Sequence, residues 1–174
     1  MRDRIGPGIR VLFVGINPGI RSAAIGHHFA GYSNRFWKLL YESDLVPQAI
    51  RTEDDARLVE WGYGLTNLIP RATPGIDTLR PDEYAAGLGA LRRKVRRWKP
   101  QLVAFVGVTL YRMVFGKATG GPATRAKPVT LGLQPDEFEG ARVFVLPNPS
   151  GRNANFSYQQ MLAAYRDLRA FLHS

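Results

Sequence analysis

Short apolar runs separated by polar, turn-forming segments predict where the strands of this chain lie. The runs are four to seven residues long and rich in Val, Leu and Phe, which is typical of strands that are buried on both faces. We expect buried strands over residues 10–16, 101–107 and 142–146, a strand or extended segment over 64–69, and an edge strand over 127–131.

Amphipathic segments between these runs predict the helices. Ser33 is expected to cap a helix that continues to residue 43, and Thr52 with Asp55 has the spacing of a capping box for a short helix that Gly62 ends. Further helices are expected over residues 81–99 and 109–115 and after Ser157. Helices that alternate with short strands predict an α/β fold, a three-layer α/β/α sandwich around a short, mostly parallel central sheet.

Composition and charge narrow the class of protein. The 174 residues are enough for one domain, which we expect to span residues 1–174, and the absence of cysteine excludes disulfides, thiolate zinc sites and iron–sulfur clusters. The net charge of +10 favours a polyanionic partner, most often nucleic acid, although solubility alone is an alternative explanation. The basic run over residues 92–99 is more simply a solvated helix face than a binding site. No apolar run reaches membrane-spanning length and no signal sequence opens the chain, so we expect a cytoplasmic protein, nucleoid-associated if bacterial.

The stretch over residues 10–38 carries the most distinctive chemistry. A strand runs directly into Gly15-Ile16-Asn17-Pro18-Gly19, where two glycines and a proline require a tight turn. Pro18 restricts the conformation of the residue before it, so Asn17 is held stiffly at the carboxyl end of a strand. In open α/β sheets that end is where ligands bind.

Two segments resemble the two long motifs of the mismatch-specific uracil-DNA glycosylase and thymine-DNA glycosylase family. The first segment is GINPG at residues 15–19 together with GHHFAGYSNRFWK at residues 26–38. The second segment is LPNPSGRNANF at residues 146–156. Smaller matches over residues 64–68, 71–75 and 132–135 extend the resemblance over nearly the whole chain. The resemblance implies a uracil-DNA glycosylase-like domain that flips a nucleotide out of the duplex. It would hydrolyse the N-glycosidic bond of uracil, mainly in U·G mismatches, and leave an abasic site; other modified pyrimidines are further candidate substrates.

The resemblance also assigns the candidate catalytic residues. Asn17 matches the asparagine that positions the attacking water, and since an amide cannot remove a proton at neutral pH, this role is orientation. His28 and Thr73 match residues near the water site, although His28 is alternatively a packing residue of the pocket. Asp77 is either a surface residue of its loop or a general base that reaches the pocket.

Base recognition and base flipping are assigned to the two motifs in the same way. The base pocket is expected to include Ile16, Ser22, Phe29 and Asn148, with the Phe29 ring stacked on the extruded base. Ser22 matches a position beside the C5 substituent, which favours uracil over thymine. Arg152 matches the arginine wedge of the thymine-type enzymes, where bacterial uracil-type members carry an aliphatic residue. Residues expected to contact DNA around the wedge are Ser150, Gly151, Arg152, Asn153 and Asn155.

No cofactor and no metal are expected. Adjacent side chains such as those of His27 and His28 usually diverge, and no suitably spaced cysteine or carboxylate joins them. The expected partner of a monomeric protein is double-stranded DNA that contains uracil mismatches, with no membrane involved. The alternative reading is a noncatalytic basic DNA-binding module of the same fold. A phosphate-binding loop is weakly supported, because neither GxxxxGK[ST] nor GxGxxG is present.

Overall fold

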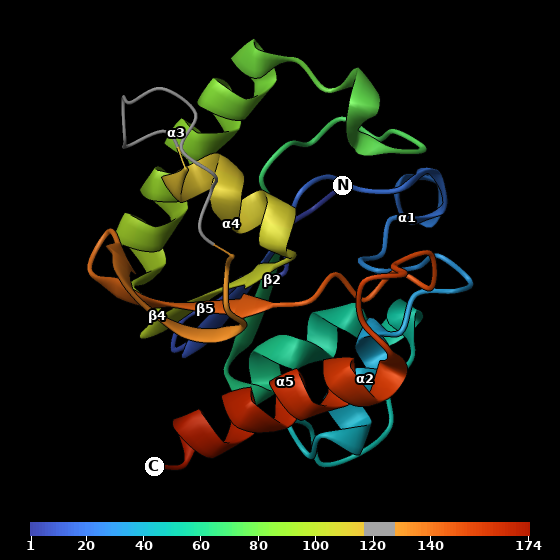
Figure 1. Cartoon of the computed structure of the whole chain (residues 1–174), viewed down its shortest axis with the longest axis vertical. Helices are drawn as coiled ribbons and strands as arrows, with labels where there is room; N and C mark the ends of the chain where they lie inside the picture. The colour runs from blue at the N-terminus through green and yellow to red at the C-terminus, as the bar shows by residue number, and fades with distance from the viewer. Residues whose placement is uncertain (117–127) are drawn as a thin grey trace.

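Five strands form one twisted sheet at the centre of the molecule (Figure 1). The computed structural model describes residues 1–116 and 128–174. The sheet order is β2-β1-β3-β5-β4, in which β1 (Val11–Gly15), β2 (Tyr63–Asn67), β3 (Leu102–Val106) and β5 (Ala141–Leu146) are parallel. Only β4 (Gly132–Phe138), at one edge of this sheet, is antiparallel to its neighbour. The predicted mostly parallel sheet is confirmed.

Helices cover both faces of the sheet, which confirms the predicted three-layer arrangement. Figure 1 shows α3 (Pro81–Trp98) and α4 (Val108–Phe115) on one side, with α2 (Phe36–Glu42) and α5 (Tyr158–Leu172) on the other. One hydrophobic core lies on each face of the sheet, and alternate residues of β1 contribute to the two cores. Val11 and Phe13 pack toward α2 and α5, whereas Leu12 and Val14 pack toward α3. This alternation is the two-residue period of a strand, and burial on both faces explains why its sequence is continuously apolar.

The long helix α3 begins and ends close to the predicted limits. Gly87 lets it approach the end of β2, since a Cβ there would lie 2.2 Å from the Leu68 carbonyl oxygen.

The basic face of α3 is only partly solvated: Arg92 and Arg96 pair with Glu139, in the turn between β4 and β5, at 2.6 and 2.7 Å. The interpretation as a solvated face is therefore incomplete, because two of its arginines fasten the helix to the edge of the sheet.

Two predicted boundaries are wrong. Helix α2 begins at Phe36 with Arg35 as its N-cap, and Ser33 lies outside it; the Oδ1 atom of Asn34 accepts a hydrogen bond from the Phe36 backbone nitrogen at 3.0 Å. The edge strand expected over 127–131 is not formed by residues 128–131, and residue 127 lies outside the described part of the chain. The edge strand is β4 instead, where Pro135 sits at an irregularity in the ladder, as proline does on sheet edges.

The predicted capping box at Thr52 and Asp55 is also wrong. The segment Thr52–Trp61 (η1) is a 3₁₀ helix whose N-cap is Arg51, and no side chain caps it. The side chains of Thr52 and Asp55 turn inward and bind the backbone of His28. A true capping box forms at α5, where Ser157 and Gln160 satisfy each other's backbone nitrogens.

Two short elements were not expected from the sequence, namely α1 (Ile20–Ile25) and η2 (Ile76–Thr78). Both follow the carboxyl ends of strands and therefore lie at the edge of the sheet where ligands bind. Across the described residues we find no helix whose length and apolar content would let it span a bilayer.

Candidate active site

A cavity of about 540 Å³ opens at the carboxyl edge of the parallel sheet. Its lining comes from the ends of four strands: Gly15 ends β1 and residues 16–22 follow it, Asn67 ends β2, Val106 ends β3, and Asn148, Ser150 and Arg152 follow β5. The loop over residues 28–34 and the tip of the loop that carries Ile76 complete the wall. This is the position that the parallel topology predicts for a binding site.

Asn17 lies in the wall of this cavity with its amide orientation fixed. Its Nδ2 donates to the Arg71 carbonyl oxygen at 2.9 Å and to Thr73 Oγ1 at 2.7 Å, with a longer contact to its neighbour Pro18. The Thr73 hydroxyl in turn donates to the Gly75 carbonyl, so it can only accept from Asn17. Since the amide hydrogens are committed to this loop, Oδ1 is the atom of Asn17 that is left to accept a hydrogen bond from a ligand or a water.

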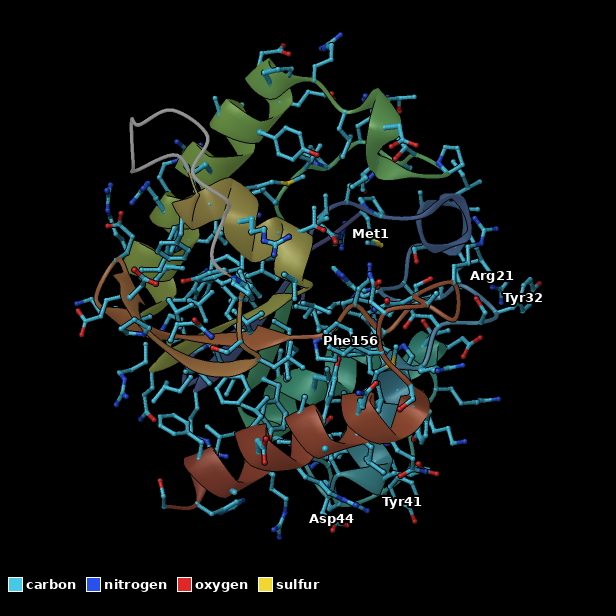
Figure 2. The ribbon with its side chains drawn as sticks, in the orientation of Figure 1. Met1, Arg21, Tyr32, Tyr41, Asp44 and Phe156 are labelled. Carbon is cyan, nitrogen blue, oxygen red and sulfur yellow. The ribbon has the colours of Figure 1, made fainter. Side chains whose placement is uncertain are left out.

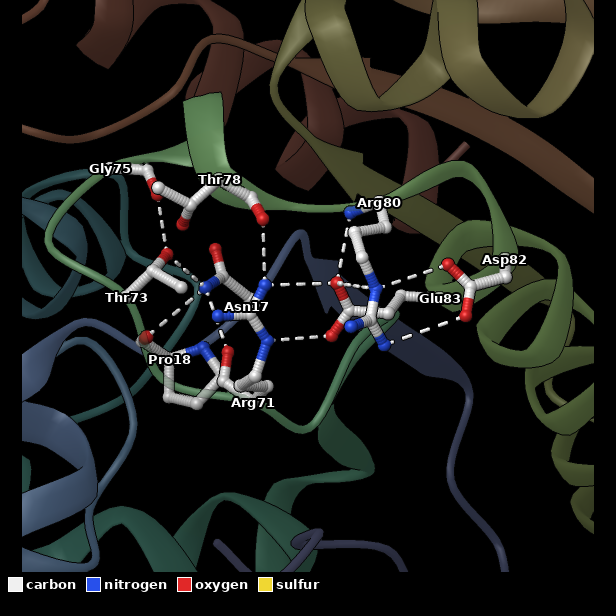
Figure 3. A network of polar contacts seen from close by, with 9 residues as sticks. All are labelled: Asn17, Pro18, Arg71, Thr73, Gly75, Thr78, Arg80, Asp82 and Glu83. Carbon is white, nitrogen blue, oxygen red and sulfur yellow. Dashed lines mark hydrogen bonds and ion pairs between the residues drawn. The ribbon is translucent and has the colours of Figure 1, made fainter.

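The loop that holds Asn17 is itself anchored to α3 (Figure 3). Arg71 makes a bidentate ion pair with Glu83, at 2.6 and 2.9 Å, and also donates to the Thr78 carbonyl oxygen at 2.8 Å. The hydrogen bond from Arg71 lowers the pKa of Glu83 to about 2, so this carboxylate stays ionised at any physiological pH. Planar bidentate pairs of this kind fix geometry as well as charge. Thr73 does not line the cavity; it accepts a hydrogen bond from the Asn17 amide and so helps to orient that side chain.

Phe29 presents its ring to the cavity from a strained backbone position. Its φ of 51° lies in the left-handed region, which a bulky residue adopts only when its surroundings impose it. The ring stacks on Phe36, with centroids 4.0 Å apart and planes 23° apart. Phe29 is half-buried and lines the cavity, so the ring face away from Phe36 is where a planar ligand could stack.

Three side chains hold the backbone of His28, the residue directly before Phe29. Its backbone nitrogen donates to Asp55 Oδ2 at 2.9 Å, and its carbonyl oxygen accepts from Trp37 Nε1 at 3.1 Å and from Thr52 Oγ1 at 2.8 Å. The Asp55 side chain is fully buried and also accepts from Arg4 and from His27. This cluster explains why Thr52 and Asp55 do not cap η1.

His28 also lines the cavity, and it is neutral there. Burial lowers the pKa of its imidazole, and Nε2 lies 2.9 Å from the Arg2 carbonyl oxygen. Because a carbonyl can only accept, Nε2 carries the ring proton and Nδ1 is an acceptor. His27 points elsewhere, toward Asp55, so the two histidines do diverge. Within residues 1–116 and 128–174, no three histidine or carboxylate side chains are grouped as a metal site would need.

The two motifs that lie more than a hundred residues apart in the sequence meet at the rim of the cavity. Arg35 donates its backbone N–H to the Pro149 carbonyl oxygen at 2.9 Å, and Gly151 packs so closely that a Cβ there would lie 2.6 Å from Ser33 Cβ. Asn148, Ser150 and Arg152 line the cavity, whereas Asn153 and Asn155 line an adjoining hollow of about 290 Å³ that shares Arg152.

Three side-chain hydrogen bonds to the local backbone define the conformation of the second-motif loop. Asn148 Oδ1 accepts from the Ser150 nitrogen, Ser150 Oγ accepts from the Arg152 nitrogen, and Asn153 Nδ2 donates to the Asn148 carbonyl oxygen. Asx and Ser turns of this kind fix loops without a regular ladder. The exposed Arg152 side chain is therefore carried by a well-defined backbone.

Sequence reasoning missed Asn67 and gave no role to Asn34. Asn67 ends β2 opposite Gly15, and Gly15 lies so near that a Cβ on it would be 2.7 Å from Asn67 Oδ1. The signal was present: a polar residue at the end of a parallel strand beside the one that carries Asn17 meets the same edge of the sheet. With Asn17 and Asn148, four asparagines line one cavity.

The remaining predicted residues divide between the cavity and the surface. Ile16 and Ser22 line the cavity, and the buried Ser22 hydroxyl accepts from the Ala30 backbone nitrogen at 3.0 Å. The structure does not bring Asp77 to the cavity: its side chain is exposed on η2, although its neighbour Ile76 contributes to the wall. Among the described residues that line the cavity none is an aspartate or a glutamate.

A separate hollow of about 390 Å³ lies between α3 and the N-terminal segment. Its floor is mostly apolar, with Ala86, Gly87 and Ala90 of α3. It shares Met1, Pro18 and Asn67 with the cavity at the strand ends, but none of the residues predicted for the site lines it.

The fold and the site define an α/β protein with a polar, amide-lined cavity that has an aromatic wall and lies at the carboxyl edge of a parallel sheet. The sequence matches the model of the uracil DNA glycosylase superfamily over residues 3–169, and the chain belongs to that superfamily. A solution NMR structure of a protein from Methanosarcina acetivorans, named as a proposed uracil DNA glycosylase, has the same fold with a TM-score of 0.62. The two chains are 17% identical, and the match covers 97% of this chain and 96% of that one.

Proposed function

We propose that this protein is a monofunctional DNA glycosylase that removes uracil from double-stranded DNA, mainly from U·G mismatches, and leaves an abasic site. In this proposal residues 1–174 act as one domain and as a monomer. The observation that carries the proposal is the composition of the cavity: four asparagines, a stacking phenylalanine and a neutral histidine, with no carboxylate among the described lining residues.

The extruded base would be held between the Phe29 ring and the asparagines. Stacking on an aromatic ring contributes about 1–3 kcal/mol per base and does not depend on the identity of the base. The amide of Asn67 offers one donor and one acceptor, which complement the O4 acceptor and the N3–H donor on the edge of uracil. Binding of a base at this depth requires that the nucleotide leaves the duplex.

The reaction breaks the bond between N1 of the base and C1′ of the sugar. The electron pair of that bond leaves with uracil as an anion, the oxygen of a water bonds to C1′, and one proton of that water finally neutralises the base. Asn17 Oδ1 is the acceptor that would orient this water, because its Nδ2 is committed to Arg71 and Thr73. An amide contributes orientation and not proton abstraction, so the sugar cation must be well developed before the water attacks.

The departing anion is favoured by the electrostatics of the cavity. Fixed donors act strongly on a developing negative charge because they need no reorganisation. The described lining carries two arginines, Arg21 and Arg152, and no carboxylate that would repel the anion or the DNA phosphates. The described lining also contains no lysine, so the proposal assigns no lysine side chain to an imine with the sugar or to the strand cleavage that follows from one.

Arg152 would keep the nucleotide outside the duplex. A side chain inserted into the base stack fills the space that the flipped nucleotide vacates and offsets part of the unstacking cost. The exposed Arg152 lies at the rim, on a loop held by its own hydrogen bonds and packed against the 28–34 segment, where an inserted side chain would need to be. Its guanidinium can also bind the widowed guanine or a phosphate.

The test is incubation of the protein with an end-labelled U·G duplex, followed by alkaline cleavage of abasic sites. We expect cleavage after alkali, none without it, and almost none with Asn17→Ala. T·G and U·A duplexes of the same sequence measure selectivity, since Ser22 beside the base leaves less room for a C5 methyl group than alanine would. A folded parent protein that binds the U·G duplex but releases no base would refute the glycosylase and favour a noncatalytic DNA-binding module.

A further inference from the structure

Exposed apolar side chains gather around the mouth of the cavity. Four of the seven exposed large hydrophobic residues in the described part of the chain line it: Met1, Ile20, Tyr32 and Ile76. Scattered exposed apolar residues are ordinary in a monomer, but a group at the rim of one polar cavity indicates a surface that meets a ligand. Tyr32 is the extreme member, since 90% of its surface is exposed.

The Tyr32 ring is held in place although it packs on almost nothing. The guanidinium of Arg21 lies 4.0 Å from the ring centroid and donates from Nη1 to the Tyr32 hydroxyl at 2.9 Å. Arg21 is fixed in turn, because its Nε donates to the Ala30 carbonyl oxygen at 2.7 Å. Figure 2 shows both side chains together at the outer edge of the molecule. Arg21 covers one face of the ring, and the other face is open to solvent.

The fold itself gains little from this arrangement. A side chain that is 90% exposed removes almost no apolar surface from water, and an exposed cation–π pair is weak. What the two contacts with Arg21 do provide is a bias toward one position of the ring, and a ring biased in this way loses less entropy when it meets a ligand. An open aromatic face beside a fixed guanidinium suits a nucleotide, because the ring can stack on a base while the guanidinium attracts its phosphate.

We propose that Tyr32 stacks on a base next to the extruded nucleotide in the same DNA strand, and that Arg21 contacts the adjoining phosphate. This inference rests on the proposed function, because the cavity must take the extruded base for its mouth to face the neighbouring nucleotides. The pair would be a second DNA contact, separate from the wedge of Arg152, and it is formed by residues 21 and 32 in the segment between β1 and α2.

Binding to an uncleavable duplex tests this contact without the need for turnover. The duplex carries 2′-fluoro-2′-deoxyuridine opposite guanine, with 2-aminopurine placed on either side of the deoxyuridine in two separate probes. Stacking on one base corresponds to about 5- to 150-fold in affinity, so we expect Tyr32→Ala to raise Kd by about tenfold. Tyr32→Phe keeps the ring and is expected to stay within about threefold of the parent. With one of the two probes, the 2-aminopurine should fluoresce more brightly in the Tyr32→Ala complex than in the parent complex.

Tyr41→Ala is the matched control. Tyr41 is also an exposed tyrosine, at 46%, but it projects from α2 and does not line the cavity (Figure 2). Its loss should leave Kd unchanged. Tyr32→Ala removes no charge, so the slope of log K against log salt should stay the same, whereas Arg21→Gln should reduce that slope by about one.

Three outcomes overturn the inference. In the first, Tyr32→Ala binds as tightly as the parent, and in the second, Tyr32→Ala and Tyr41→Ala weaken binding equally. An unchanged 2-aminopurine signal in both probes overturns it as well. These results are distinct from a failure of the proposed function, which is a parent protein that releases no uracil from the natural U·G duplex. If the parent releases uracil but Tyr32→Ala binds DNA as tightly as the parent, the Tyr32 contact is refuted and the proposed glycosylase activity is not.

Discussion

Gly15→Ala adds one methyl group to the floor of the cavity and tests the whole geometry of the site. Gly15 is the last residue of β1, is buried, and has no left-handed φ, so alanine can adopt its backbone conformation. The new Cβ would lie 2.7 Å from Asn67 Oδ1 and 3.8 Å from Phe29 Cζ. The second distance is an ordinary contact, but the first is shorter than real Cβ contacts allow.

The expected loss of activity follows from how far Asn67 must move. To reach an ordinary contact of 3.4 Å its amide oxygen must shift by about 0.7 Å, and a misplacement of about 1 Å typically costs a factor of about 10² in rate. We therefore expect the single-turnover rate on a U·G duplex to fall by about 10- to 100-fold, or about 1.4–2.7 kcal/mol in the barrier. Stability should change by less than about 1 kcal/mol, because the end of a side chain moves and not the backbone.

Single-turnover cleavage of the U·G duplex and thermal unfolding of the same preparations separate these effects. Gly89→Ala is the control, since its Cβ would meet only the Arg93 guanidinium, at an ordinary 3.6 Å, on a helix remote from the cavity. In an Asn67→Ala background Gly15→Ala should cause almost no further loss of the single-turnover rate, because the Asn67 amide with which its Cβ would clash is absent. The base is not held in this cavity if Gly15→Ala keeps the parent rate. The same conclusion follows if Gly15→Ala lowers the rate equally in the absence of the Asn67 amide.

Four other changes probe the remaining parts of the site. Asn17→Asp should lower the single-turnover rate at pH 7.5, because a carboxylate would face the Arg71 carbonyl oxygen that now accepts from the amide; a faster variant would contradict this. Asp55→Asn should destabilise the protein by about 3–5 kcal/mol in urea unfolding, because it breaks a buried ion pair; a loss below about 1 kcal/mol would contradict this. Burial lowers the pKa of His28, so the folded state resists protonation: the unfolding free energy should be level above pH 6.5 and fall below it, more steeply in the parent than in His28→Gln. Ser22→Ala should raise the T·G to U·G rate ratio, and an unchanged ratio would remove Ser22 from substrate selection.

The central strands and long helices could be predicted because their sequences reflect burial directly. The apolar runs at β1, β3 and β5 are buried on both faces, and α3 and α5 repeat apolar residues at helical spacing. The edge strand β4 carries Pro135 and acidic residues and is half exposed, so its sequence resembles a loop. Helix α1 has six residues, too few for a periodic pattern to stand out.

The errors within the site come from long-range contacts that local spacing cannot reveal. Thr52 and Asp55 have the spacing of a capping box, but their partner is the His28 backbone, which lies 24 and 27 residues away. The burial of Asp55 depends on Arg4 from the N-terminal segment, and no pattern in the sequence connects these two residues. Asn17 could be found because a motif marks it, whereas Asn67 is evident only when β2 is placed beside β1.

The absence of a carboxylate from the described lining suits a reaction that separates charge next to DNA. A carboxylate general base beside C1′ would activate the water and stabilise the sugar cation, but its negative charge would also face the departing uracil anion and the phosphates. The four amides carry no net charge, so they can orient the water and bind the base without opposing either anion. A neutral His28 has the same property as the amides, since its ring offers a hydrogen-bond acceptor without adding charge. In the proposed reaction the rate therefore depends on how well the site stabilises the leaving base, and we expect fit in the cavity, not a strong nucleophile, to discriminate between bases.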